Sequence, residues 1–478
     1  MRDVRPASVR TTRYSSTFHI FATALLAATT AACTADTQNP AGPLTAAGNE
    51  RIGADVLAAD AIIVSNAAEL VAALSPANAG RHIHVLAGDY SVTAPLTVPD
   101  QATLEGEGVM QFDGSGLPTG FAAATRTSLT MTANVAGNVL TLGHESTVRG
   151  IAIQDLPGRT GNSIAVLSRQ AGDQVFTRIT EVEINSPNAH TIAPTGPAGC
   201  GIAAWTQNPN LGSDPAPHAG AAIGSQVTRS LIRSSQAGTG CGIFAFNFSP
   251  LSTVSIALAD NVIGGGMIAS GGVSRPDAVH DSRTEIQSHR NLFRNESPDL
   301  CAPQRLGWNA QGGSGVPAAL QIQETRNNVL RIHSVNDRIE GFTTGIAATG
   351  GRRFFGAPTA GPSSDNSVDL DLIGTTIVTP YCGGASFVAD FRLSGATASG
   401  TTLVPGDGNK LRVVMRGVTG SGSRSNVYAH ALGSAGSLAP EFQGTGNRLE
   451  ISGNLKAFST TNEAIAPAPG SHFFTSGK

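Results

Sequence analysis

The residues best suited to chemistry lie together in one charged segment, residues 274–309. Ten of these 36 residues are charged, about twice the 14% of the whole chain, and two histidines lie among them. A site that acts on acidic sugars needs a positioned base and arginines that hold carboxylates. We assign His280, Asp281 and Arg283 as candidate catalytic residues, with His280 or Arg283 as the base and Asp281 orienting it. The candidate substrate-binding residues are Arg275, Asp277, His289 and Arg290.

The same segment has a second interpretation, in which its charges neutralise one another. Runs of charge usually form the solvated outer faces of strands and loops and are held in ion pairs. Charged side chains that converge on one concave face would favour an enzyme. Charged side chains dispersed in ion pairs would favour a non-catalytic binding or structural protein.

Other chemistry finds little support in the composition. Lysine occurs only at Lys410, Lys456 and Lys478, which disfavours a lysine base or a Schiff base. Asp369 and Asp371 alternate along one predicted strand, but two carboxylates without a third ligand leave a Ca²⁺ site unsupported, and no other metal or cofactor is evident. The 31 basic and 34 acidic residues balance to a net charge of −3, which argues against a nucleic-acid partner.

The N-terminal residues have the features of an export signal. Several arginines precede an apolar run from Phe18 to Ala28, which is too short to span a membrane, and small residues follow it. The run Thr-Ala-Ala-Cys at 30–33 is similar to the lipobox of bacterial lipoproteins, although Thr30 stands where leucine is usual. Residues 1–33 are therefore expected to be a signal. It is either cleaved to release the chain into the periplasm or medium, or processed so that Cys33 carries a lipid anchor in the outer membrane.

Four cysteines remain after such a signal: Cys200, Cys241, Cys301 and Cys382. Export favours disulfides, and three pairings of two bridges can be drawn. Cys200 and Cys241 share the sequence Gly-Cys-Gly-Ile, which suggests equivalent strands of adjacent coils. Such strands lie about 4.8 Å apart, within reach of a disulfide. We predict a disulfide between Cys200 and Cys241 and leave the other two cysteines unassigned.

The elements that position these residues are short strands separated by turns. Residues 34–60 are rich in Ala, Thr, Gly, Asn and Pro and are expected to be a flexible tether. A short helix is predicted after Asn66, with Leu70, Val71 and Leu74 on one face that covers the open end of the strands after it. Three short strands then come within about 25 residues, which leaves no room for crossover helices.

Later strands recur at a nearly constant spacing. Their centres fall at Val148 and Ile179, and again at Val227, Val254 and Ile286, at intervals of 27 to 32 residues. A period of this size, with about three short strands in each repeat, is typical of a β-solenoid.

Two small motifs return with the strands. Gly-Ile segments at 201–204, 242–245 and 345–348 are expected to occupy equivalent strands of different coils. Asparagines recur along the chain and are expected to lie at one turn of the coil, where stacked side chains can form hydrogen bonds with one another and with the backbone. These asparagines are Asn138, Asn261, Asn291, Asn328, Asn366, Asn409 and Asn447.

The opening stretch, residues 64–108, carries a resemblance to a known superfamily. Its predicted helix, its Gly88-Asp89-Tyr90 turn and the run Thr-Leu-Glu-Gly-Glu-Gly at 103–108 resemble the start of pectate-lyase-like β-helix proteins, and the likeness extends over roughly residues 60 to 460. The resemblance implies an exported protein and often a lyase, hydrolase or epimerase acting on uronic-acid polymers. The chain lacks the paired aspartates and Gly-His-Gly of polygalacturonases, the Trp-x-Asp-His of pectate lyases and the Asp-Pro-His-Glu of alginate epimerases.

The sequence therefore predicts an all-β protein. Residues 61–460 are expected to form a right-handed parallel β-helix with a short N-terminal capping helix, followed by a C-terminal tail, 461–478. We expect it to bind or act on polysaccharide, as a lyase or hydrolase of acidic sugars or as a non-catalytic surface solenoid. A membrane contact is expected only through Cys33, and the oligomeric state is left open.

Overall fold

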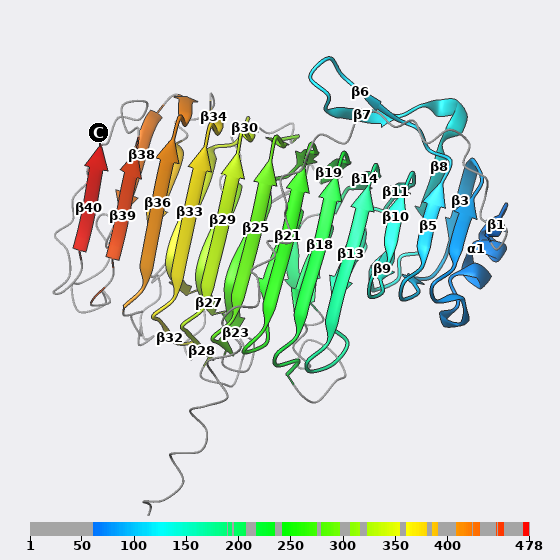
Figure 1. The fold of residues 1–478 in the computed structure, drawn as a ribbon, viewed down its shortest axis with the longest axis horizontal. Helices are drawn as coiled ribbons and strands as arrows, with labels where there is room; N and C mark the ends of the chain where they lie inside the picture. The colour runs from blue at the N-terminus through cyan, green and yellow to red at the C-terminus, as the bar shows by residue number, and fades with distance from the viewer. Residues whose placement is uncertain are drawn as a thin grey trace, which may run out of the picture. The chain divides into compact units, whose positions relative to one another are not determined.

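The described part of the chain is a stack of coils built from short parallel strands. In the computed structural model it winds as a right-handed parallel β-helix (Figure 1), which confirms the predicted fold class. Three long parallel sheets, named A, B and C here, run along the stack, and each coil visits them in that order. The structure describes residues 61–188, 190–193, 196–206, 217–234, 241–274, 279–296, 306–315, 323–353, 360–379, 385–390, 408–422, 424–430, 446, 448–453 and 472–477.

Sheet A has 13 strands, and sheets B and C have 10 strands each. Sheet A consists of β1 (Ile62–Val64), β2 (His82–Val85), β5 (Thr103–Gly106), β10 (Thr147–Arg149), β13 (Gln174–Thr180), β18 (Ala222–Thr228), β21 (Thr253–Ala259), β25 (Arg283–His289), β29 (Val329–Val335), β33 (Ser367–Ile373), β36 (Lys410–Arg416), β39 (Arg448–Gly453) and β40 (His472–Gly477). Sheet B consists of β3 (Gly88–Val92), β8 (Thr127–Met131), β11 (Ala152–Gln154), β14 (Glu183–Ser186), β19 (Leu231–Ser234), β22 (Val262–Gly264), β26 (Leu292–Arg294), β30 (Arg338–Glu340), β34 (Thr376–Thr379) and β37 (Thr419–Gly422). Sheet C consists of β4 (Leu96–Val98), β9 (Leu140–Leu142), β12 (Ile164–Leu167), β17 (Cys200–Thr206), β20 (Cys241–Asn247), β23 (Met267–Ser274), β27 (Leu306–Gly315), β31 (Thr344–Arg353), β35 (Ala385–Asp390) and β38 (Arg424–His430).

Several smaller elements lie outside the three long sheets. A three-stranded parallel sheet joins β24 (Val279–His280), β28 (Gln323–Arg326) and β32 (Ala360–Ser364), and two antiparallel pairs join β6 (Met110–Phe112) to β7 (Pro118–Phe121) and β15 (Thr191–Ala193) to β16 (Gly196–Ala198). The helical elements are α1 (Ala67–Ala73), η1 (Pro76–Asn78) and η2 (Ala123–Thr125). Strand β40 lies within 461–478, so sheet A reaches into the segment that the sequence assigns to a tail.

The interior of the stack consists of aliphatic columns, in which one position recurs from coil to coil. In sheet C, Ile202 pairs with Ile243, and the column continues through β23 and β27 to Ile346. The three Gly-Ile segments therefore occupy equivalent strands, as predicted. Side chains alternate between the interior and the outer face because successive residues of a strand point to opposite sides.

The strand spacing was predicted correctly in one place and incorrectly in another. Val148 pairs with Ile179, as expected. Val227 pairs with Leu258 rather than with Val254, whose partner in β18 is Ile223. The predicted register was wrong by four residues there and by two residues in the next coil, where Val254 pairs with Thr284 rather than with Ile286. An even shift keeps a side chain on the same face of the sheet, so the strands themselves were still found.

Short turns with a left-handed residue flank sheet A on both sides. From β10 to β37, each turn from sheet A to sheet B has two residues, of which the first has positive φ and the second is buried. Glycine occupies the first position in some coils, but Glu181, Arg229, Asp260, Arg290 and Asn336 adopt it in others, with φ from 50° to 58°. This conformation is a property of the repeat, because it recurs at the same place in successive coils.

The asparagines form separate ladders, which corrects the prediction of a single turn. Asn261 and Asn291 lie after sheet A, where the Asn261 backbone N–H donates to Oδ1 of Asn291 over 3.0 Å. Asn328 and Asn366 lie before sheet A, where the Asn328 N–H donates to Oδ1 of Asn366 over 3.0 Å and the ladder continues to Asn409. Asn138 belongs to a third turn, before sheet C, and Asn447 is outside the described residues.

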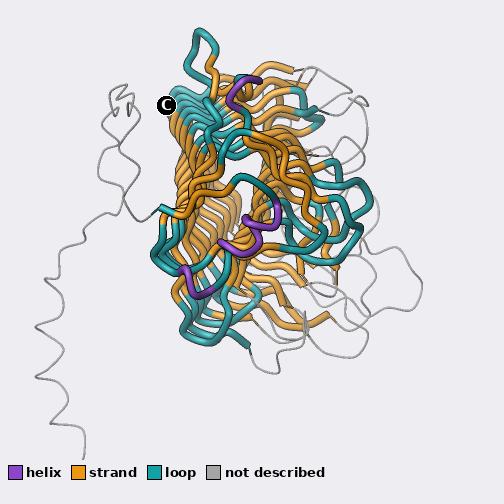
Figure 2. Tube along the Cα trace, turned by 90° about the vertical axis from the view of Figure 1, so that its right-hand side faces the viewer, coloured by secondary structure: helices purple, strands orange, loops and turns teal. Residues whose placement is uncertain are grey.

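Helix α1 lies across the N-terminal end of the coils (Figure 2). The predicted cap is present: Asn66 Oδ1 accepts from the Glu69 N–H over 3.0 Å, and the Glu69 carboxylate accepts from the Ser65 N–H over 2.8 Å. Leu70 is buried against the first coil as predicted, but Val71 is 54% exposed, so the predicted apolar face was wrong at that residue. Among the described residues, no helix combines the length and the apolar character that a bilayer crossing requires.

Candidate functional site

The three candidate catalytic residues lie around one turn that leads into sheet A. His280 ends β24, Asp281 is the left-handed residue of the turn with φ 56°, and Arg283 begins β25. Nδ1 of His280 lies 2.8 Å from Oδ2 of Asp281, and this hydrogen bond, followed by one from Asn327, lowers the pKa of Asp281. His280 and Asp281 therefore contact each other, whereas Arg283 pairs with Glu285 on the outer face of its own strand.

Of the substrate-binding candidates, the two that the structure describes, His289 and Arg290, are not brought to this turn. His289 ends the seven-residue strand that Arg283 begins, so the two lie about 20 Å apart. Arg290 is the left-handed residue of the next turn, and its Nε lies 2.8 Å from Oδ1 of Asp260. Arg275 and Asp277 lie outside the described residues.

Cross-strand ion pairs hold several of the other charges on the outer face of sheet A. Arg331 lies 3.8 Å from Glu285 and Arg412 lies 2.9 Å from Asp369, each from Nη1 to a carboxylate oxygen. Asp371 accepts from both His333 and Arg416. The two carboxylates considered for Ca²⁺, Asp369 and Asp371, are therefore neutralised by cations. The described charges of residues 274–309 lie dispersed along the solenoid.

A second exposed group on sheet A was missed in the sequence. Phe176 is 44% exposed on β13, and its ring lies over Gly224 of the next strand, where an added Cβ would come within 2.4 Å of Cδ1. Gln174 and Arg178 are exposed on the same face of β13. Arg178 forms no ion pair with the described residues, in contrast to Arg283. The available signal was the alternation of Gln174-Val-Phe-Thr-Arg178, which points all three side chains outward.

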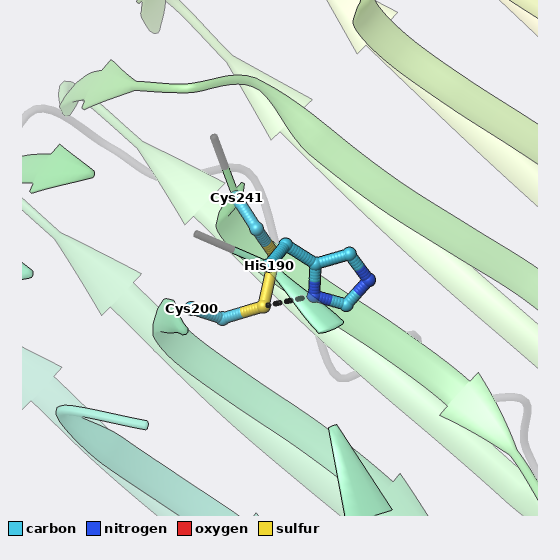
Figure 3. A group of neighbouring side chains, drawn as sticks. All are labelled: His190, Cys200 and Cys241. Atoms are coloured by element: carbon cyan, nitrogen blue, oxygen red, sulfur yellow. Dashed lines mark hydrogen bonds between the residues drawn. A yellow bond between two sulfur atoms is a disulfide. The ribbon is translucent and has the colours of Figure 1, made fainter. Parts of the chain in front are cut away.

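The predicted disulfide is confirmed, and a histidine packs against it (Figure 3). Cys200 and Cys241 pair directly across β17 and β20 with a Cα–Cα distance of 4.6 Å. Nδ1 of His190 lies 3.3 Å from Sγ of Cys200 and 3.2 Å from the carbonyl oxygen of Ala198. Burial lowers the pKa of His190 to about 4, so the ring is neutral at neutral pH although part of it remains exposed.

The cysteines stand in an apolar layer on the outer face of sheet C. Phe244, Phe246 and Phe248 follow one another along β20 and its end, with the rings of Phe244 and Phe246 4.0 Å apart between centroids. Trp205 is 4% exposed in the same layer, while Trp308 is fully buried in the interior core. Both tryptophans therefore serve packing rather than a sugar-binding surface.

Comparisons with known proteins give little detail. No protein-family model and no curated protein matches the chain. Among solved structures, the chain is similar to the Dettilon tailspike protein (gp208), with 12% sequence identity and a TM-score of 0.36 over 82% of this chain. The match covers 63% of the tailspike chain, less than two thirds of its length.

Proposed function

We propose that the protein is an exported, non-catalytic polysaccharide-binding β-helix of the pectate-lyase-like superfamily, whose binding surface is the outer face of sheet A around β13. The observation that carries the proposal is the exposed ring of Phe176 beside Arg178, which has no ion-pair partner among the described residues. Export is proposed from residues 1–33, with Cys33 either lipidated or removed.

The chemistry of this group suits acidic sugars. The apolar C–H face of a sugar ring can stack on the exposed Phe176 ring, as aromatic side chains do with flat apolar partners. The planar Arg178 guanidinium can bind a carboxylate through two parallel hydrogen bonds. Gln174, and Gln226 paired with Arg178 on β18, offer amide donors and acceptors to hydroxyl groups.

The test is binding to a panel of neutral and acidic polysaccharides by affinity electrophoresis. Phe176→Ala and Arg178→Ala should each weaken binding about tenfold or more, because each removes one of two groups that contact the sugar. Val109→Ala, which trims an exposed apolar residue elsewhere, and Arg283→Ala, which removes a paired arginine, should bind as the wild type does. Wild-type affinity in both Phe176→Ala and Arg178→Ala would overturn the proposal.

A lyase or hydrolase at the His280 turn is the second candidate. The 2.8 Å contact between His280 and Asp281 favours it, because a carboxylate that orients a histidine is a usual arrangement for a base. New absorbance of unsaturated uronate products, present in the wild type and lost in His280→Ala, would establish a lyase there. Reducing ends released without that absorbance and lost in the same variant would establish a hydrolase.

A further inference from the structure

The first two coils bring histidines and carboxylates together on the outer face of sheet A. His82 and His84 alternate along β2, so both rings point outward. Glu105 lies directly opposite His84 on β5, and Glu107 lies two residues after Glu105 in the sequence. One ligand atom from each of His82, His84 and Glu105 lies within 4.8 Å of the other two.

Each carboxylate already has one oxygen bound by a group other than a histidine. Nη2 of Arg149 lies 2.6 Å from Oε1 of Glu105, and the Ala87 N–H donates to Oε2 of Glu107 over 2.8 Å. The remaining oxygens face the histidines: Oε2 of Glu105 lies 2.7 Å from Nε2 of His82, and Oε1 of Glu107 lies 3.4 Å from Nε2 of His84. The carboxylates are thus oriented by their surroundings, as outer contacts orient metal ligands.

The histidines are partly buried and incompletely bonded. The side chains of His82 and His84 are 28% and 15% exposed, and that of Glu105 is 20% exposed. Nδ1 of His84 is buried and has no hydrogen-bond partner among the described residues. A buried ring nitrogen without a partner is unfavourable unless a ligand uses its lone pair.

We propose that His82, His84 and Glu105 bind a divalent transition metal ion of the zinc class, with Glu107 or water as a fourth ligand. Two imidazoles and one carboxylate are a usual zinc set, whereas Ca²⁺ requires a shell of oxygens. Arg149 acts through Glu105, whose orientation it fixes, and is a positioning residue. The ion bridges β2 and β5, so it ties together the first two coils next to α1.

The experiment titrates Zn²⁺ into the metal-free full chain by calorimetry. His84→Gln and Glu105→Gln should each raise the dissociation constant at least about tenfold. His333→Gln, which changes an exposed histidine on β29, is the matched control and should bind as the wild type does. Because the ion binds the folded chain, saturating Zn²⁺ should raise the melting temperature of the wild type and of His333→Gln more than that of His84→Gln.

A Co²⁺ titration separates this site from the cysteines. Cobalt bound by nitrogen and oxygen gives visible ligand-field bands without the near-ultraviolet charge-transfer band of a thiolate ligand. We expect visible bands that are lost in His84→Gln. Equal zinc affinity in the wild type and in both variants, or a cobalt spectrum with thiolate character that survives in His84→Gln, would overturn the proposal.

Discussion

Asp337 occupies the place in its coil that Asn291 occupies one coil earlier, and it is a buried carboxyl group with 1% exposure. It accepts hydrogen bonds from the Asn291 N–H over 2.8 Å and from Oγ of Ser334 over 2.7 Å. Burial raises its pKa despite these bonds. In the preceding coil, Nδ2 of Asn291 bonds Oγ of Ser288, the residue that pairs with Ser334. An asparagine can therefore replace Asp337 with equivalent bonds.

We predict that Asp337→Asn retains or increases the free energy of unfolding at neutral pH, whereas Asp337→Leu lowers it by about 2 kcal/mol, because it leaves buried donors without an acceptor. Because the pKa of Asp337 is raised on folding, its contribution to the free energy of unfolding is largest below the ordinary value of 3.8. It falls as pH rises from there through the folded value, and Asp337→Asn removes this pH dependence. Urea midpoints of the three proteins at pH 4, near the ordinary carboxyl value of 3.8, and at neutral pH check this. A lower neutral-pH midpoint for Asp337→Asn than for Asp337→Leu would contradict it.

His190 makes the folded chain sensitive to acid. Its pKa falls from 6.5 to about 4 on folding, so the unfolded chain binds the proton more readily between these values. The contribution of neutral His190 to the free energy of unfolding is therefore fully present above pH 6.5. It is lost as pH falls toward 4, by about 2 kcal/mol at pH 5. Urea unfolding at pH 8 and pH 5 measures the loss, which should shrink in His190→Gln. An unchanged pH dependence in that variant would assign the acid sensitivity to other groups.

At the scale of the element, the strands could be predicted, but only some of their cross-strand partners could, among them Val148 with Ile179 and Cys200 with Cys241. Alternation along a strand shows which residues face outward, and in β25 the structure places Arg283 and Glu285 together on the outer face. The partner across the sheet depends on the length of the intervening coil: Arg331 meets Glu285 from 46 positions later. The ion pairs could therefore be identified only in the structure, which shows that Arg283 is paired with Glu285.

The asparagines show the same limit. Asparagine suits any buried turn that needs both a donor and an acceptor, so its return indicates turns without saying which turn. The exposed pair Phe176 and Arg178 was missed for a related reason. The high density of charge favoured residues 274–309, whereas Arg178 is distinguished by the lack of an acidic partner among the described residues, which the sequence does not show.

The glycine of the Gly-Ile motif is required by close packing between sheets. A Cβ added to Gly242 would lie 2.4 Å from Cγ2 of Ile263 and 2.5 Å from the carbonyl oxygen of Gly264. We predict that Gly242→Ala lowers the free energy of unfolding by about 2 kcal/mol or more, because backbone must move to relieve the overlap. Gly114→Ala is the control, since nothing lies within 4 Å of its added Cβ. Equal thermal midpoints for the two variants would contradict the prediction.

For the molecule as a whole, α1 protects the N-terminal end of the stack. Leu70 is 2% exposed against the first coil, and its neighbour Val71 is 54% exposed. We predict that Leu70→Asp releases the helix and exposes strand β1, whose free edge can then pair with another chain. Light scattering should show concentration-dependent association for Leu70→Asp and none for Val71→Asp. Monomeric behaviour of both variants would show that α1 is not what blocks the edge.

The two-residue turns between sheets A and B have a consequence for how such a chain can diverge. From Gly150-Ile151 to Gly417-Val418 these turns keep one length, while the distance between paired residues of sheet A varies from 30 residues (Thr253 to Arg283) to 48 (Ile179 to Val227). An insertion of one residue at this corner would turn every following side chain of its strand to the opposite face. Between β5 and β8 the same corner carries the β6–β7 hairpin, and β8 still pairs in register with β3 and β11. From β10 to β37 the corner has a constant length, and loops are gained or lost on the remaining sides of the coil.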